Sequence, residues 1–292
     1  MAHTHKSASD NLRRVWLALV LTGSFMIVEV VGGLLSGSLA LLADAGHMLT
    51  DTMALALTAA AFHISAKPAD ARRSYGYSRF QILAAFVNGL SLIVIVGWIL
   101  FEAVQRLIAP IHVMGETMLV VAAAGLVINI IAFYLLHGGD QENLNMRGAA
   151  LHVVGDLLGS VAAIIAAIVI LATGWMPIDP ILSVVVAMLI LRSAWILVRR
   201  SAHILLEGAP EGVDSSQIHQ RIVAKIAGVS DVHHIHVWGL TPEHRMLTMH
   251  IVLCDDAVDG SSAVKQAKAI LRDDFSIAHS TIEVETDSCA DS

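Results

Sequence analysis

The chain is short of charge and of cysteine. Charged residues make up 15% of its 292 residues and hydrophobic residues 56%, whereas about 25% of a typical soluble domain is charged. This imbalance excludes an ordinary soluble domain and indicates a membrane protein. The two cysteines, both in the polar C-terminal part, are too few for a disulfide framework. The first residues, MAHTHKSASDN, lack the apolar core of a cleavable signal peptide, so we expect the first apolar segment to be retained.

What the chain does contain is a series of long apolar segments. Each is close to the roughly 20 residues that a membrane-spanning helix needs, and polar or turn-forming residues separate them. The six segments are approximately 13–35, 39–63, 80–104, 115–136, 148–173 and 177–198. We therefore expect an α-helical membrane protein with six transmembrane helices in residues 13–208, preceded by a cytoplasmic N-terminal arm at residues 1–12.

Basic residues lie mainly on one side of these segments. Lysine and arginine precede the first segment, separate the second from the third and the fourth from the fifth, and follow the sixth. The opposite side has Arg106 and little else. Because cytoplasmic loops carry an excess of lysine and arginine, we expect a multi-pass protein of the inner (cytoplasmic) membrane with both termini in the cytoplasm.

The composition changes after Glu207. Residues 209–292 hold 13 acidic and 6 basic residues, whereas the first 208 residues hold 12 of each. Apolar periodicity in this tail predicts helices and strands in the order α-β-β-α-β, at 214–227, 232–240, 246–254, 261–272 and 279–285. The pattern is typical of a small cytoplasmic α+β domain at residues 209–292.

Two of the apolar segments carry the same pair of ionisable residues. His47 and Asp51 lie in the second, and His152 and Asp156 lie in the fifth. Residues four apart share a helix face, and each charged group at mid-membrane costs about 2.5–3.5 kcal/mol or more. Facing pairs would supply two imidazole nitrogens and two carboxylate oxygens, a tetrahedral set that suits Zn²⁺. The repetition predicts a metal site, and polar helix packing is the alternative.

Asp44 adds a further carboxylate one helical turn before His47. It is either a group that exchanges protons or admits the metal, or a group that caps local structure. Glu29, in the first apolar segment, is a polar packing or pore-lining residue whose role the sequence leaves open.

The tail is rich in histidine around residues 232–240. Strict alternation along a strand places His233 and Ile235 on one face and His234 and His236 on the other.

The stretch GGLLSGSLALLADAGHMLTD, the paired HxxxD motifs and the tail domain together resemble the cation diffusion facilitator family. Within it, the chain is most similar to the bacterial zinc exporters that resemble vesicular zinc transporters, and the resemblance covers nearly the whole chain. It implies a homodimer in the lipid bilayer that exports Zn²⁺ from the cytoplasm by proton antiport through the two HxxxD pairs. No nucleic-acid partner is expected.

The resemblance also implies that the tail domain binds zinc, in a structural or regulatory role. The implied ligands are three histidines and a carboxylate, and a tail thiolate is available to complete a site within the chain or across the dimer. These residues are His233, His250, His279, Glu285 and Cys289.

The loop after the second apolar segment departs from part of the family. Asp70 is present, but Arg73 and Tyr77 occupy positions at which some members have histidines of a second metal site, so we expect no metal there. Arg79 matches a basic residue of the family that pairs with an acidic residue after the sixth span. Here that residue is Glu207, so an inter-domain ion pair is expected.

Three other functions compete with zinc export. One is an exporter of Cd²⁺, Co²⁺ or Ni²⁺, and another is a membrane protein that senses zinc without moving it. The third is an intramembrane metalloenzyme. The chain has no His-Glu-x-x-His motif, and no serine or cysteine nucleophile accompanies the membrane histidines. We therefore expect a protein that is not an enzyme.

Overall fold

The computed structural model describes residues 2–49, 52, 69–137, 144–242, 244–254 and 259–286, and among these it leaves out the side chains of 2–16, 18, 136, 137 and 144–155. The chain divides into two compact units. The first, the membrane unit, comprises residues 1–57 and 87–197, and the second, the cytoplasmic unit, comprises residues 58–86 and 198–292. Each unit is considered by itself.

Helices are the only regular secondary structure in the described part of the membrane unit. Five helices contain an apolar stretch long enough to cross a membrane, and Leu39–Leu49 is a shorter apolar helix. The long helices are α1 (Ala2–Ser36), α3 (Phe80–Ile108), α4 (Gly115–His137), α5 (Leu144–Thr173) and α6 (Ile178–Leu205). The expected helical membrane fold is thus confirmed, although α1 begins within the predicted arm. The rest of the second span, beyond residue 52, lies outside the described residues.

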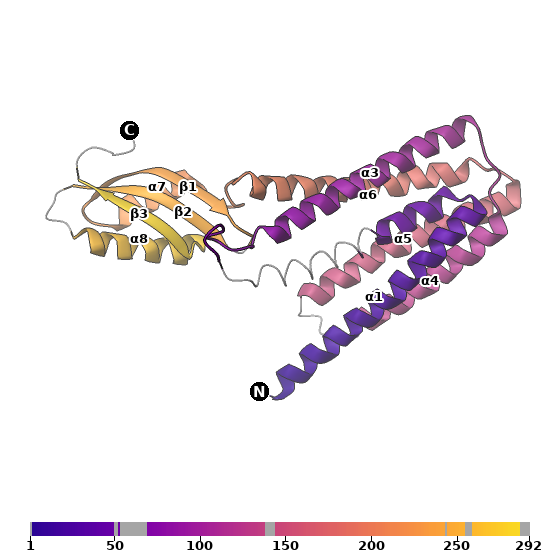
Figure 1. Cartoon of the computed structure of the whole chain (residues 1–292), viewed down its shortest axis with the longest axis horizontal. Helices are drawn as coiled ribbons and strands as arrows, with labels where there is room; N and C mark the ends of the chain where they lie inside the picture. The colour runs from indigo at the N-terminus through magenta and orange to yellow at the C-terminus, as the bar shows by residue number, and fades with distance from the viewer. Residues whose placement is uncertain are drawn as a thin grey trace. The chain divides into compact units, whose positions relative to one another are not determined.

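Helix α4 packs against both α1 and α5 (Figure 1). A Cβ atom at Gly32 of α1 would lie 2.7 Å from Cγ2 of Val121 on α4, a distance that real Cβ atoms essentially never show. The absence of a side chain at residue 32 therefore permits the close approach of α1 to α4.

The Leu39–Leu49 helix contacts two separate groups of helices. Leu39 and Ala43, four residues apart on one face, belong to an apolar cluster with α3 and α6. Ala40 and Leu41 belong to a second apolar cluster with α4 and α5. The helix that carries His47 therefore lies between these two groups.

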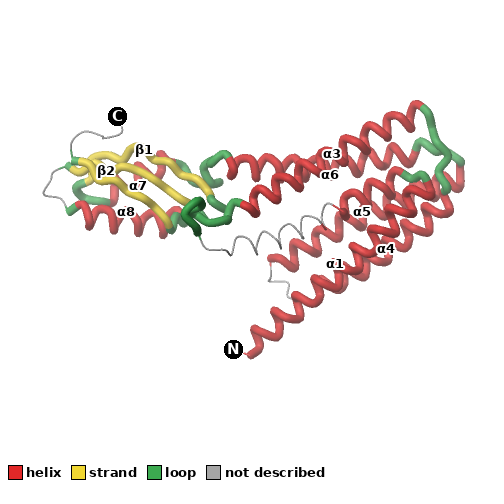
Figure 2. Tube along the Cα trace, viewed as in Figure 1, coloured by secondary structure: helices red, strands yellow, loops and turns green. Residues whose placement is uncertain are grey.

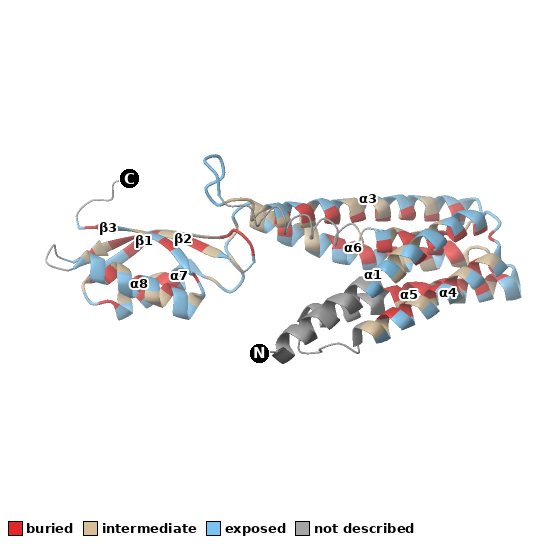
Figure 3. Cartoon of the chain, turned by 60° about the horizontal axis from the view of Figure 1, so that its bottom comes forward, coloured by how far each residue is buried: buried red, intermediate tan, exposed pale blue. Residues whose placement is uncertain are grey.

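The cytoplasmic unit contains the predicted α-β-β-α-β order. Its elements are α7 (Ser215–Lys225), β1 (Val229–Gly239), β2 (Arg245–Leu253), α8 (Gly260–Phe275) and β3 (His279–Glu285). The strands, yellow in Figure 2, form one sheet in the order β1-β2-β3. Strand β1 runs antiparallel to β2, and β3 runs parallel to it. Helices α7 and α8 cover one face of this sheet (Figure 3), and apolar residues of both helices and all three strands form its core.

Strand β1 departs from regular alternation at the histidines. His233 pairs with His250 and His236 pairs with Thr248, so three residue steps on β1 match two on β2. The extra residue makes a β-bulge, and His234 within it has a left-handed backbone with φ of +48°. The prediction that His234 and His233 face opposite sides of the sheet was therefore wrong.

Candidate metal sites

The predicted membrane site is partly described. His47 lies half-buried on the Leu39–Leu49 helix, and Asp156 lies on α5 with only 2% of its surface exposed. The backbone of His152 lies on α5. The side chain of His152 and all of Asp51 lie outside the described residues, so the convergence of all four groups stays a prediction.

The helices that carry the two HxxxD pairs are in contact. Ser160 Oγ on α5 lies within hydrogen-bonding distance of Asp44 Oδ2, at 3.5 Å. A Cβ atom at Gly159 would overlap the Asp44 carboxylate, so the glycine makes room for the buried acid. Ala40, one turn before Asp44, clusters with residues that follow Ser160 on α5. The helices therefore run antiparallel. In this register His47, about one turn after Asp44, is level with Asp156, about one turn before Ser160.

Other buried oxygen atoms adjoin this contact. Asn129 Nδ2 on α4 donates to Ser160 Oγ at 3.2 Å. A Cβ atom at Gly125 would lie 2.9 Å from Glu29 Oε1, which places the acid of α1 against α4. Glu29 is fully buried, and neither of its carboxylate oxygens has a hydrogen-bond partner among the described residues. An unpaired buried carboxylate is costly, so this region is suited to binding a cation or a proton.

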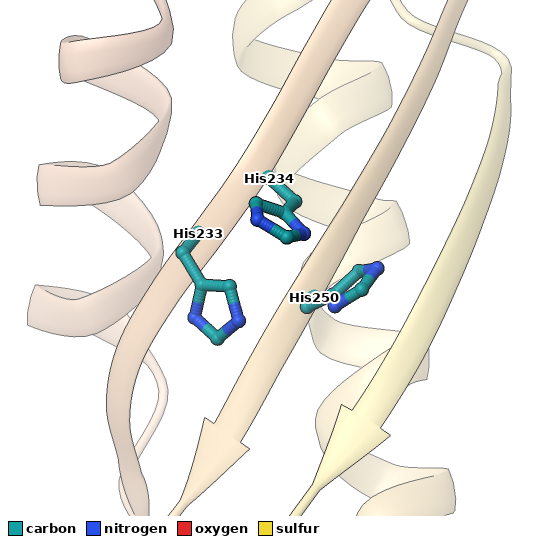
Figure 4. A group of neighbouring side chains, drawn as sticks. All are labelled: His233, His234 and His250. Carbon is teal, nitrogen blue, oxygen red and sulfur yellow. The ribbon is translucent and has the colours of Figure 1, made fainter. Parts of the chain in front are cut away.

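A second cluster lies in the cytoplasmic unit. His233 and His234 come from β1 and His250 from β2, and the three rings lie close together (Figure 4), with centroids 4.9–5.4 Å apart. One nitrogen from each ring lies within 4.8 Å of the others. The bulge in β1 explains this arrangement, because consecutive residues of a regular strand point to opposite faces.

Glu285, the last residue of β3, contacts two of these histidines. Its Oε1 lies 2.8 Å from Nδ1 of His250, and its Oε2 lies 3.1 Å from Nε2 of His233. His250 and Glu285 are both buried. Imidazole nitrogens and a carboxylate oxygen are ordinary Zn²⁺ ligands, so this donor set fits a zinc ion.

A supporting contact surrounds His233. Asp231 Oδ2 lies 3.7 Å from Nδ1 of His233. Asp231 Oδ1 lies 2.8 Å from Nε2 of His219. The hydrogen bond from His219 lowers the pKa of Asp231, and the nearby His233 acts in the same direction. The ring of His233 therefore has a carboxylate on each side.

The structure does not bring every predicted tail ligand together. His279 pairs with Met246 at the start of β3, about 20 Å along the strand from Glu285 at about 3.3 Å per residue. Its ring contacts Tyr75 instead, with centroids 6.5 Å apart. Cys289 lies outside the described residues. The sequence prediction missed His234, because regular alternation gives no signal for a bulge.

The loop that precedes α3 holds Asp70 in other interactions. The backbone N–H groups of Arg72 and Arg73 donate to Asp70 Oδ1 at 2.8 Å each, and these bonds lower the pKa of Asp70. The guanidinium of Arg73 lies 4.0 Å from Asp70 and donates to Tyr77 Oη at 2.9 Å. A cationic side chain therefore lies beside Asp70.

Arg79 and Glu207 form an ion pair in the cytoplasmic unit. Nη2 of Arg79 lies 3.0 Å from Oε1 of Glu207. Their side chains are 34% and 62% exposed, and pairs this exposed contribute at most about 1 kcal/mol. The pair therefore contributes little to stability.

Known proteins resemble this chain along nearly its whole length. The family described as "Cation efflux transmembrane domain" matches residues 15–206, and "Cation efflux protein, cytoplasmic domain" matches residues 210–287. Zinc transporter ZitB of Escherichia coli is 48% identical over 99% of this chain and 94% of its own. The cadmium, cobalt and zinc/H⁺-K⁺ antiporter of Bacillus subtilis is 40% identical over 98% of this chain and 93% of its own. The metal-bound C-terminal domain of the CzcD transporter from Cupriavidus metallidurans is 38% identical, with a TM-score of 0.23, over 25% of this chain and 99% of that one.

Proposed function

Because the chain belongs to the cation efflux family, we propose that it is a homodimeric membrane transporter that exports Zn²⁺ from the cytoplasm in exchange for protons. Both termini lie in the cytoplasm in this proposal, as the distribution of lysine and arginine favours. Similarity to the ZitB zinc transporters over nearly the whole chain supports zinc as the cargo.

The contact between the Leu39–Leu49 helix and α5 carries the proposal. Asp44 meets Ser160 in an antiparallel register, and His47 follows level with Asp156. Continued by one turn, the same register would pair Asp51 with His152. It supports a site of two imidazoles and two carboxylates between the two helices. Two carboxylates would balance the charge of Zn²⁺ in a region where water is scarce.

Proton exchange follows from the chemistry of these ligands. Imidazole and carboxylate groups bind metal only when deprotonated, and histidine changes charge near neutral pH. A proton and Zn²⁺ therefore compete for the same atoms. The buried carboxylates of Asp44 and Glu29 lie beside this site, and we assign Asp44 to proton exchange. The named activity of the Bacillus subtilis relative supports antiport.

We further propose that the tail domain holds a zinc ion with a structural or regulatory role. Within one chain, the proposed ligands are His233, His234 and His250, whose ring nitrogens lie within 4.8 Å of one another, and Glu285, which contacts His233 and His250. His279 and Cys289 remain proposed ligands, and Cys289 could complete a site within the chain or across the dimer.

Two other functions remain to be separated from zinc export by experiment. Export of Cd²⁺ or Co²⁺ is favoured by the name of the Bacillus subtilis relative. A zinc sensor would bind the ion at the tail without moving it. Membership of a family of transporters disfavours an enzyme.

The decisive experiment is metal flux into sealed proteoliposomes that contain the purified full-length chain. With an acidic lumen, Zn²⁺ should accumulate inside, and a protonophore should slow it. Asp156→Asn keeps the shape of the side chain and removes its charge, so it should abolish uptake. Ser193→Ala, on the exposed side of α6, is the control. The absence of uptake of any cation would refute transport, and uptake indifferent to the pH gradient would refute antiport alone.

A further inference from the structure

A buried carboxylate of α6 binds the beginning of the Leu39–Leu49 helix. Asp179, in the first turn of α6, has no exposed surface. Its Oδ1 accepts from Ser38 Oγ at 2.7 Å and from the backbone N–H of Ala40 at 3.2 Å. Its Oδ2 accepts from the backbone N–H of Leu39 at 2.7 Å. One side chain therefore joins two segments that lie 139–141 residues apart.

This contact supplies a need of the helix. The first N–H groups of any helix lack partners within it, and a polar residue just before the helix usually accepts from them. The side chain of Ser38 accepts only from the backbone N–H of Leu41, at 3.3 Å. Asp179 accepts from the backbone N–H groups of Leu39 and Ala40. The carboxylate also lies at the beginning of two helices, where the aligned peptide dipoles favour negative charge.

An arginine of α3 completes the network. Arg106 is 9% exposed, and its Nη1 lies 3.9 Å from Asp179 Oδ2. The same side chain donates to the backbone oxygen of Gly37 and to Glu102 Oε1, at 3.0 Å in the latter case. Gly37 has φ of +72°, a conformation that favours glycine. The network thus ties the turn before the Leu39–Leu49 helix to both α3 and α6.

The consequence reaches the predicted metal ligands. His47 lies eight residues after Leu39, about 12 Å along the helix at 1.5 Å per residue. The helix lies between two apolar clusters, and apolar contacts are not directional. Hydrogen bonds at its first turn are directional. They therefore determine how far the helix is shifted and rotated, and hence where His47 stands relative to Asp156.

We propose that Asp179 is a positioning residue for metal transport, because its carboxylate holds the helix that carries His47 in the register that sets it level with Asp156. The inference rests on the proposed membrane metal site. Asp179 is neither a metal ligand nor a proton-exchanging group in this proposal. It acts through the backbone of residues 38–40.

The test compares two carboxylates that each lie in the first turn of a helix. Asp179→Asn keeps the size of the side chain but removes its charge. Glu116→Gln makes the same change at an exposed position of α4 and is the matched control. Both full-length variants are reconstituted, and zinc uptake is fitted for KM and maximal rate per folded dimer. Hydrogen exchange is measured in parallel on peptides covering residues 38–49.

The expected result is a change in ligand geometry without loss of the fold. Misplacement of functional groups by about 1 Å can reduce activity by about 10²-fold. A smaller shift of His47 should therefore raise the KM of Asp179→Asn about three- to tenfold. Exchange in residues 38–42 should become faster. Ser38→Ala removes one of the three bonds to Asp179 and also the bond that Leu41 donates to Ser38, and it should shift KM less but in the same direction. Glu116→Gln should match the wild type in both measurements.

Two outcomes would overturn the inference. Faster exchange in Asp179→Asn with an unchanged KM would show that the carboxylate only completes the helix end. If Asp179→Asn does not fold, Ser38→Ala decides, and an unchanged KM in that variant refutes positioning. A wild-type protein without saturable zinc uptake would refute the proposed function itself, which the wild-type measurement detects separately.

Discussion

His234 has an unfavourable backbone conformation and is a proposed metal ligand, so glycine and alanine should have different effects there. Both substitutions remove the imidazole. Only glycine also relieves the left-handed conformation, which has φ of +48°. In the metal-free domain, His234→Gly should therefore be more stable than His234→Ala. In zinc, both variants should bind the ion more weakly than the wild type.

The magnitudes follow from the backbone and from mass action. A left-handed conformation costs a residue with a Cβ about 1–2 kcal/mol, and the greater flexibility of glycine in the unfolded chain offsets about 0.5–1 kcal/mol of the relief. The net difference between the two variants is about 0.75 kcal/mol at the middle of these ranges, which corresponds to about 3–6 °C in Tm for a domain of this size. Each tenfold loss of zinc affinity removes about 1.4 kcal/mol of zinc-dependent stability when zinc is in excess.

The assay is thermal unfolding of residues 209–292, which have their own hydrophobic core. Each variant is measured in chelator and in excess zinc, and calorimetry supplies the affinity. His236→Ala is the control, because His236 lies on the same strand outside the cluster of His233, His234 and His250. Equal Tm values for the glycine and alanine variants in chelator would refute the backbone argument. Wild-type affinity in both variants would refute His234 as a ligand.

Three further predictions concern other regions. Replacing His47 with Asp should raise the ratio of Cd²⁺ to Zn²⁺ flux, because a carboxylate adapts to a larger ion more readily than imidazole does; an unchanged ratio in an active variant would exclude a role in selectivity. Reversing either charge of the pair formed by Arg79 and Glu207 should alter zinc flux, while the free energy of unfolding changes by no more than about 1 kcal/mol. Reversing both charges should restore flux. No recovery in the double variant would show that the pair does not act as a unit. The hydrogen bond from Lys225 lowers the pKa of Asp274, so the pair stabilises the tail domain above the unfolded-state pKa of about 3.9 and ceases to do so as pH falls through the lower folded value. Asp274→Asn should therefore reduce Tm at pH 7 and leave it unchanged at strongly acidic pH, and a loss of equal size at both would contradict this assignment.

The sequence predicted the elements of the fold well because lipid and water impose simple patterns on it. Apolar stretches identified the membrane helices, and period-two alternation identified the strands of the tail domain. Helix ends were less accurate. Helix α6 continues to Leu205, beyond the predicted end at 198, because Arg199 and Arg200 end the apolar stretch without ending the helix.

The parts that could not be predicted depend on contacts between distant residues. The bulge at His234 depends on how β1 pairs with β2, and nothing local to the sequence determines that register. Asp179 resembles any acidic residue at a helix start, and only the folded chain shows that it also binds residues 38–40. The HxxxD pairs were found because the same spacing occurs twice. Whether Asp51 and His152 meet stays a prediction.

The cluster in the cytoplasmic unit takes its donors from every strand of the sheet. His233 belongs to β1, His250 to β2 and Glu285 to β3. An ion held by all three would act as a cross-brace on the face that α7 and α8 leave uncovered. The rigidity of the sheet would then increase and decrease with the concentration of free zinc in the cytoplasm.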